Sequence, residues 1–359
     1  LPIIITILFL FTNIKKYFQL KAKGILENNI DGVTVIFGAI QLLVPHNYVP
    51  FKYQQIALAK KLKQYLSSKM PDFKPDVISV HFPMTNYYLC KGFIDGNQKT
   101  ACVLHNSDIS LLRKMKPEKK RFIIEELKKT YRNIATRSSI IHEQAKALGI
   151  CDVSSPVILS GISENLIADD EYISKKDYST LKDNMKIVYA GKLVKQKRVD
   201  LILKAISLLN ESTTIHLTVI GDGPEKDELI NLTKKLEISD FVEFCGAVDR
   251  KRVVDIMRQS DVFAMISKNE TFGLVYLEAM AQGLITIGSS GEGIDGTIIN
   301  GVNGFLVSPD NESELCECIK TIHNLSNTEL SEISLNAYQT AVEMTDSKMA
   351  RKYLDFVNS

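Results

Sequence analysis

Two glutamates, Glu270 and Glu278, stand eight residues apart on either side of a glycine turn. The stretch from Leu274 to Met280 has the pattern of a buried amphipathic helix that begins just after the first glutamate. A helix N-terminus offers free N–H groups and partial positive charge, so it suits an anion such as a phosphate. We therefore expect Glu270 in the loop before this helix and Glu278 about two turns along it, facing the same ligand.

The simpler interpretation of these glutamates is a solvated pair, because glutamates on helices usually face water. The neighbours of Glu278, however, are Leu277, Ala279 and Met280, which are unusual beside a solvent-facing charge. The apolar surroundings favour a ligand site.

Two lysines follow the predicted end of a buried strand. The apolar run at 186–190 predicts this strand, and Gly191 ends it. Lys192 and Lys197 come next, five residues apart, and could clamp a diphosphate as point charges. Ligands of parallel sheets bind beyond the carboxyl ends of strands, which supports this interpretation. Lysine-rich loops are common, so the pair alone is a weak signal.

A competing motif, G-E-G-I-D-G at 291–296, matches the dinucleotide-binding pattern G-x-G-x-x-G. A nicotinamide dehydrogenase would continue into a long helix and then a strand with an acidic end. Here residues 297–304 hold two asparagines and two glycines, which leaves room only for a very short helix. The context argues against dinucleotide binding.

Length and composition predict a globular protein of two domains. The chain has 359 residues, 45% hydrophobic and 24% charged. Its six cysteines show neither metal-ligand spacing nor a disulfide framework, so we expect them to be reduced. The apolar run at 1–11 is too short to span a bilayer and is interpreted as a buried parallel strand. The chain begins with Leu1, so upstream residues could be missing.

The charges are divided unevenly along the chain. Residues 1–165 hold 23 Lys and Arg against 12 Asp and Glu, so 23 − 12 = +11, and the remainder carries 21 − 30 = −9. The basic run at 113–121 is either a solvated helix face or a surface for anionic membranes. Nucleic acid is a weaker partner, because no nucleic-acid module is evident and aromatic residues do not interleave with the basic ones.

Strands and helices alternate in both halves, which predicts two parallel α/β domains. A polar stretch at 168–184 is interpreted as the linker. In the first half we expect strands at 2–11, 33–37, 76–81, 101–105, 138–142 and 156–159, and helices at 16–29, 53–69, 118–135 and 143–148. In the second half we expect strands at 186–190, 215–220, 242–244, 261–265, 284–287 and 305–307, and helices at 198–209, 224–235, 250–258, 273–282 and 311–324.

Five motifs in order resemble the family 4 retaining glycosyltransferases, whose fold is GT-B. They are G-K-L-V-x-x-K at 191–197, V-I-G-D-G-P at 219–224, V-x-F-x-G at 242–246, E-T-F-G-L running to E-A-M-A-x-G at 270–283, and N-G-x-N-G-F-L-V at 300–307. The first half resembles the family only at 74–83, 103–108, 140–143 and 160–162.

The resemblance implies an α/β fold of two Rossmann-like, doubly wound domains facing a cleft. Residues 1–165 would form the acceptor-binding domain and 166–340 the nucleotide-sugar-binding domain. The last helix, within 341–359, would cross back to the first domain.

The resemblance also implies roles for the site residues. Lys192 and Lys197 would hold the donor diphosphate, and Glu270 would contact the donor sugar. Glu278 would bind the ribose, and His105 of the acceptor domain would lie near the reacting carbon. A histidine satisfied structurally at a strand end is an equal alternative for His105. The remaining donor-site residues are Gly191, Phe272, Gly273 and Leu274, with the backbone N–H groups of the last two at the phosphates.

The implied activity is transfer of a sugar from a UDP- or GDP-sugar to a glycan or lipid-linked acceptor, in surface polysaccharide biosynthesis. In the mechanism usually proposed for the family, the acceptor attacks from the face of the leaving group, without metal or cofactor. We expect a cytoplasmic protein, peripheral on the inner face of the cell membrane.

Three departures from the family pattern keep a second reading open. No glycine follows the first strand at 12–17, Arg198 stands where glycine is usual, and 291–296 replaces a Gly-Gly-x-x-Glu pattern. The alternative is a catalytically impaired nucleotide-sugar-binding or scaffold protein of the same fold.

Overall fold

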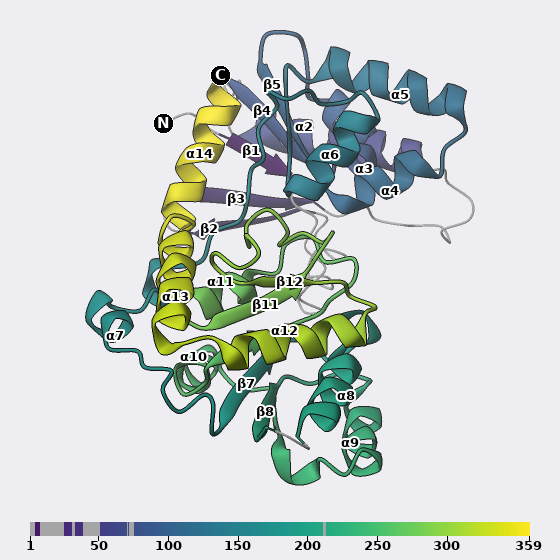
Figure 1. Ribbon diagram of the computed structural model, residues 1–359. Helices are drawn as coiled ribbons and strands as arrows, with labels where there is room; N and C mark the ends of the chain where they lie inside the picture. Colours follow the sequence, from purple (N-terminus) through teal and green to yellow (C-terminus); the bar gives the residue numbers. More distant parts are fainter. Residues whose placement is uncertain are drawn as a thin grey trace. The chain divides into compact units, whose positions relative to one another are not determined.

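The computed structural model describes residues 4–7, 25–30, 33–38, 51–69, 71, 75–210 and 213–359. The chain divides into two compact units, whose elements are labelled in Figure 1. Unit 1 comprises Leu1–Thr136, Gln144–Pro156 and Leu354–Ser359. Unit 2 comprises Arg137–Glu143 and Val157–Tyr353.

Unit 1 contains a parallel sheet in the order β1-β4-β5-β6. Its strands are β1 (Ile4–Ile7), β4 (Val77–His81), β5 (Lys99–Leu104) and β6 (Asn133–Thr136). Strand β1 confirms a parallel strand within the apolar run at 1–11. The segment at 12–17, where a glycine loop is missing from the sequence, lies outside the described residues.

Helices connect the parallel strands of this sheet and bury their apolar sides on it. They are α2 (Phe51–Lys69), α3 (Pro83–Lys91), α4 (Asn106–Arg113), α5 (Pro117–Thr130) and α6 (Ser139–Ala147), whose first half belongs to unit 2. The core includes Leu58, Val80, Leu89, Cys102 and Leu127, all at or below 5% exposure. The burial of Cys102 fits the expectation of reduced core cysteines, and all six cysteines are free thiols.

One helix and two strands predicted in the first half are wrong, and a second predicted helix is shorter than expected. The last part of the helix predicted at 16–29 is instead a strand, β2 (Ile25–Ile30), and residues 16–24 lie outside the described residues. Strand β2 pairs antiparallel with β3 (Val33–Gly38), which confirms the strand predicted at 33–37. The strand predicted at 138–142 is the start of α6, where Ser138 Oγ accepts a hydrogen bond from Ile141 N at 3.3 Å. The predicted helix at 118–135 ends at Thr130 because β6 follows, and 156–159 forms no strand beyond one bridge residue.

Unit 2 contains a six-stranded parallel sheet in the order β12-β11-β10-β7-β8-β9. The strands are β7 (Met185–Ala190), β8 (Ile215–Ile220), β9 (Val242–Gly246), β10 (Val262–Ala264), β11 (Ile285–Ser289) and β12 (Phe305–Val307). Numbered along unit 2, this is the doubly wound order 3-2-1-4-5-6. The order reverses between β7 and β10, so the loops after these two strands meet at one point of the sheet edge.

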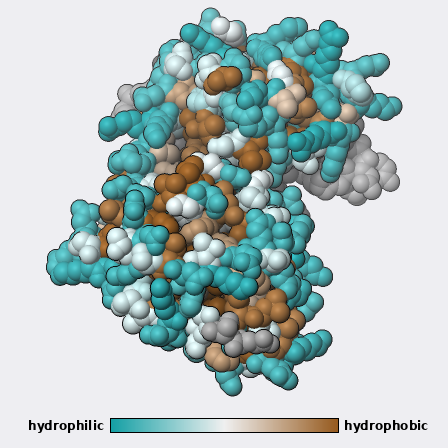
Figure 2. All heavy atoms as spheres, viewed as in Figure 1, coloured by the Kyte–Doolittle hydropathy of each residue, from teal (hydrophilic) through white to brown (hydrophobic). Residues whose placement is uncertain are grey.

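Strands buried on both faces account for the apolar runs of unit 2. Val188, Phe263 and Ile287 from neighbouring strands are fully buried, as are most residues of α8. In Figure 2 hydrophilic side chains predominate on the visible face, with hydrophobic patches between them. The helices are α8 (Val199–Leu209), α9 (Lys226–Lys235), α10 (Arg250–Arg258), α11 (Leu274–Met280), α12 (Glu312–Asn324) and α13 (Asn327–Val342).

The segment at 168–184, predicted as the linker, lies inside unit 2 and does not join the two units. It contains a short helix, α7 (Asp170–Ser174), which is capped where Asp169 Oδ1 accepts from Tyr172 N at 2.8 Å. The last helix, α14 (Asp346–Asn358), begins in unit 2 and ends in unit 1, where Asn133 Nδ2 donates to Phe356 O at 3.1 Å. The assignment of acceptor and donor roles to two domains stays a prediction.

Candidate functional site

Lys197 and Glu270 form an ion pair at the point where the strand order reverses. Lys197 ends the short 3-10 helix η2 (Lys195–Lys197) after β7, and Glu270 lies in the loop after β10. Their side chains are 22% and 18% exposed, so the pair is reachable but largely shielded from water. The sequence indicated both residues separately, and the sheet brings them into contact.

The backbone of Glu270 is held by the loop at 291–296. Glu270 N donates to Glu292 Oε2 at 2.9 Å, and Gly293 N donates to Glu270 O at 3.0 Å. A Cβ on Gly293 would lie 2.0 Å from Thr271 O, so this close approach requires glycine. The loop that matches a dinucleotide motif in sequence therefore supports Glu270. Sequence analysis missed this role of Glu292.

The two lysines predicted as a diphosphate clamp differ in their surroundings. Lys197 Nζ lies 3.7 Å from Met265 Sδ in addition to its contact with Glu270. Lys192 is exposed and makes no ion pair within the described residues. Its backbone is nevertheless fixed, because Tyr189 Oη donates to Lys192 O at 3.1 Å. One lysine is thus ordered by the protein, and the other reaches into solvent.

Helix α11 begins directly after Gly273, as predicted. Gly273 is its N-cap, with φ 82° and ψ 78°, a conformation that glycine adopts freely. Phe272 is buried beside it, and Tyr276 N donates to Gly273 O at 3.0 Å. The N–H groups of Leu274 and Val275 open the helix and have no acceptor within it.

Glu278 lies on α11 and pairs with Arg250 at the start of α10. The glutamate side chain is only 13% exposed, whereas Arg250 is 59% exposed. Each of the two glutamates therefore has its own cation: Lys197 for Glu270 and Arg250 for Glu278. Sequence analysis missed Arg250, which is far from Glu278 along the chain.

In unit 1, His105 follows β5 and forms the N-cap of α4. Its Nε2 lies 3.0 Å from Nδ1 of His81, which ends the neighbouring strand β4. The Phe82 ring stacks on His105 with centroids 3.7 Å apart. Sequence analysis missed the histidine pair, although both residues end predicted neighbouring strands. The place of His105 near a reacting carbon stays a prediction.

Asp108 connects the segment at His105 with the segment that follows His81, inside unit 1. Its two carboxyl oxygens accept hydrogen bonds from His105 N at 2.8 Å and Met84 N at 3.0 Å. Burial raises the pKa of Asp108 to about 7 and outweighs the two hydrogen bonds, which favour the carboxylate. Asp108 thus fixes both loops through backbone contacts.

Residues 171–340 match the family described as Glycosyl transferases group 1. This match covers just under half of the chain, and together with the relatives that follow it identifies the chain as a glycosyltransferase. N-acetyl-alpha-D-glucosaminyl L-malate synthase from Bacillus anthracis is 28% identical over 269 residues, covering 73% of this chain and 68% of that protein. An uncharacterized glycosyltransferase from Methanocaldococcus jannaschii is 26% identical, covering 80% of this chain and 74% of that protein.

Solved structures give the fold of this glycosyltransferase as GT-B. The crystal structure of Anabaena HepE in complex with UDP has a TM-score of 0.67 at 20% identity, covering 84% of this chain and 82% of that chain. Sucrose-phosphate synthase from Thermosynechococcus elongatus has a TM-score of 0.69 at 16% identity, covering 93% and 85%.

No described helix of the glycosyltransferase is long and apolar enough to cross a membrane. Within the same part of the chain, no three His, Cys, Asp or Glu side chains gather as a metal site.

Proposed function

We propose that this glycosyltransferase takes its sugar from a UDP- or GDP-sugar and transfers it, with retention, to a glycan or lipid-linked acceptor in surface polysaccharide biosynthesis. The observation that carries the proposal is the Lys197–Glu270 pair at the reversal of the strand order. In doubly wound sheets this is where nucleotide ligands bind. HepE, which has a similar fold, was solved with UDP.

The charges of the site fit a departing nucleoside diphosphate. Cleavage of the bond to the sugar leaves negative charge on the diphosphate, and preorganised cations and N–H groups stabilise it. Lys197, Lys192 and the first N–H groups of α11 supply that stabilisation. The lysine ammonium has three N–H donors, so Lys197 can hold a phosphate oxygen while it stays paired with Glu270.

The two glutamates would bind the hydroxyl groups of the donor. A carboxylate accepts several hydrogen bonds, so Glu270 can accept from the sugar and Glu278 from the ribose while each keeps its cation. Gly191 and Phe272 would line the same donor site. Because Lys192, Lys197 and the N–H groups of α11 can themselves stabilise the diphosphate charge, we propose a reaction that needs no metal or cofactor. His105 would stabilise charge or position the acceptor hydroxyl.

The release of nucleoside diphosphate from a panel of UDP- and GDP-sugars, in the presence of lipid acceptors, tests this function. We expect Glu270→Ala to abolish release, because the donor sugar loses its carboxylate. Glu332→Ala, an exposed glutamate on α13, is the matched control and should keep wild-type rates.

The same assay, together with a measurement of thermal stability, distinguishes sugar transfer from donor binding without transfer. The sequence without glycine at 12–17 favours the alternative, a catalytically impaired nucleotide-sugar-binding or scaffold protein. A donor that raises the thermal stability of the wild-type protein but yields no nucleoside diphosphate would support that alternative. Wild-type turnover in Glu270→Ala would contradict the assigned site.

We also propose that unit 1 docks on the anionic inner face of the cell membrane. Leu111 on α4 and Phe122 on α5 are 42% and 59% exposed. The basic run at 113–121 lies between them in the chain, with five lysines or arginines classed as exposed. Exposed apolar side chains beside basic ones suit the interface of an anionic bilayer.

A further inference from the structure

Arg198 adopts a backbone conformation that normally favours glycine. It joins η2 to α8 with φ 50° and ψ 40°, in the left-handed region. A residue with a Cβ is less favourable there than glycine. Because this conformation is unfavourable for a residue with a Cβ, contacts of the arginine side chain must offset it.

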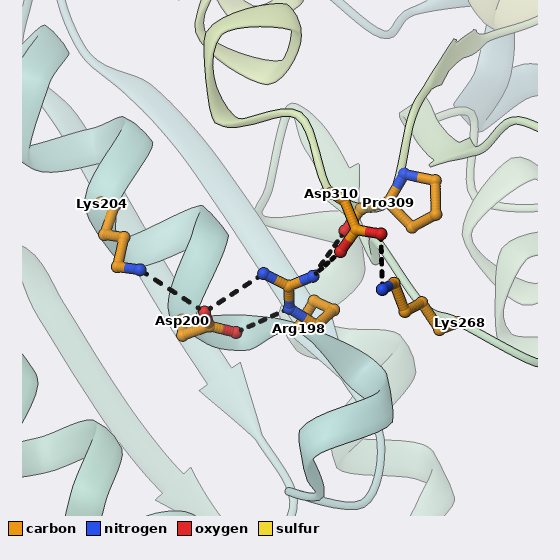
Figure 3. A network of polar contacts seen from close by, with 6 residues as sticks. All are labelled: Arg198, Asp200, Lys204, Lys268, Pro309 and Asp310. Atoms are coloured by element: carbon orange, nitrogen blue, oxygen red, sulfur yellow. Dashed lines mark hydrogen bonds and ion pairs between the residues drawn. The ribbon is translucent and has the colours of Figure 1, made fainter.

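The guanidinium of Arg198 contacts two segments at once (Figure 3). On one side, Nε lies 3.2 Å from Asp200 Oδ1 in the first turn of α8. On the other side, Nη1 donates to Pro309 O at 2.8 Å and to Asp310 Oδ1 at 2.6 Å in the loop after β12. The planar fork of arginine makes both contacts possible, which a lysine ammonium would not reproduce.

Lys268 extends the network to a third loop, the one that follows β10. Lys268 Nζ lies 2.5 Å from Asp310 Oδ2, the oxygen that Arg198 does not use. Lys268 N donates to Gln196 O at 2.7 Å in η2. Figure 3 shows Asp310 between the two cations. The loops that follow β7, β10 and β12 are therefore tied into a closed ring of contacts.

The residues of this ring lie next to the proposed donor-site residues along the chain. Lys197 immediately precedes Arg198, and Glu270 lies two residues beyond Lys268. Movement of either loop would therefore separate Lys197 from Glu270. Displacement of a binding group by even 1 Å is costly when a ligand must be held in one geometry.

We propose that Arg198 is a positioning residue for the donor site: through Asp310 and Lys268 it holds the loop of Lys197 against the loop of Glu270. The inference rests on the proposed donor site at this pair. We expect replacement of Arg198 to change ligand affinity more than the stability of the fold. Replacement of Arg198 by glycine removes both a strained conformation and exposed ion pairs, whose separate contributions are small.

Calorimetric titration of the full chain with UDP and with GDP tests the proposal. Using the nucleotide that the wild-type protein binds, we expect Arg198→Gly to weaken affinity at least fivefold. Its apparent melting temperature should stay within about 3 °C of wild type, which corresponds to about 1 kcal/mol for a domain of this size. Lys204→Ala is the control, because the ion pair of Lys204 among the described residues is with Asp200, at 3.7 Å, and this variant should bind as wild type does.

A double-mutant cycle tests whether the effect runs through Asp310. Asp310→Asn should weaken affinity to a similar extent, and Arg198→Gly/Asp310→Asn should be no weaker than either single variant. Wild-type affinity in Arg198→Gly would overturn the role of Arg198 and leave the donor site standing. Losses that multiply in the double variant would do the same, because they would show that Arg198 and Asp310 act independently. A wild-type protein that binds neither UDP nor GDP would overturn the donor site and this inference together.

Discussion

Lys197 and Glu270 illustrate how single residues create the site. Each side chain is about one-fifth exposed, and each lies beside a cation or carboxylate of the opposite charge. In surroundings partly shielded from water, this pairing holds both side chains in place. A phosphate and a sugar hydroxyl can join the pair without breaking it, because both groups have spare hydrogen-bonding capacity.

Gly273 gives a stability prediction at the same scale. A Cβ there would lie 2.7 Å from the Tyr276 ring, in addition to the cost of a left-handed φ of 82°. We expect Gly273→Ala to lower the free energy of unfolding by about 2–4 kcal/mol, measured by urea denaturation. Gly301→Ala is the control, because Gly301 has a similar φ of 76° but nothing within 4 Å of a Cβ.

The difference between these two variants isolates the steric contact from the backbone strain. Gly301→Ala should lower the free energy of unfolding by about 1 kcal/mol, from backbone strain alone. Equal losses in both variants would show that contact with Tyr276 does not determine how α11 begins.

Among the elements, those with strong apolar periodicity were predictable from sequence. The apolar run ending at residue 190 and the helix start at Leu274 were both confirmed, because burial on both faces and a glycine turn leave clear patterns. Strand β3 was predicted at 33–37, but β2 and its pairing with β3 were missed, although the sequence Asp31-Gly32, frequent in hairpin turns, stands between them in the chain. The start of α6 was missed because Ser138 was not recognised as its cap.

Contacts between distant elements explain what sequence reasoning could not supply. Glu270 was indicated by its motif, but Glu292 and Arg250, which contact the two glutamates, come from separate loops and helices. His81 approaches His105 only because β4 and β5 are neighbours in the sheet. Spacing along the chain does not reveal such pairs, whereas the strand order does.

At the scale of the whole molecule, the two units differ in charge. Unit 1 holds 22 Lys and Arg against 11 Asp and Glu, so 22 − 11 = +11, and unit 2 holds 22 against 31, so 22 − 31 = −9. A basic first half is suited to an anionic surface, and the exposed Leu111 and Phe122 add apolar area in the same unit. This asymmetry supports docking through unit 1 rather than unit 2.

Flotation with vesicles measures this docking. We expect binding to vesicles that contain phosphatidylserine, weakening as salt rises, and little binding to phosphatidylcholine alone. Phe122→Asp should reduce binding severalfold. Leu208→Asp is the control, because Leu208 is equally exposed, at 59%, but lies on α8 of unit 2. Equal binding to neutral and anionic vesicles would argue against the membrane proposal.

The most direct test of the donor site is calorimetric titration of Lys197→Ala with the nucleoside diphosphate that the wild-type protein binds, UDP or GDP. Loss of the ammonium at the diphosphate should weaken affinity about tenfold or more, which is about 1.4 kcal/mol. Lys234→Ala, an exposed lysine on α9, should bind like the wild type. Wild-type affinity in Lys197→Ala would contradict the claim that the Lys197–Glu270 pair holds the sugar donor.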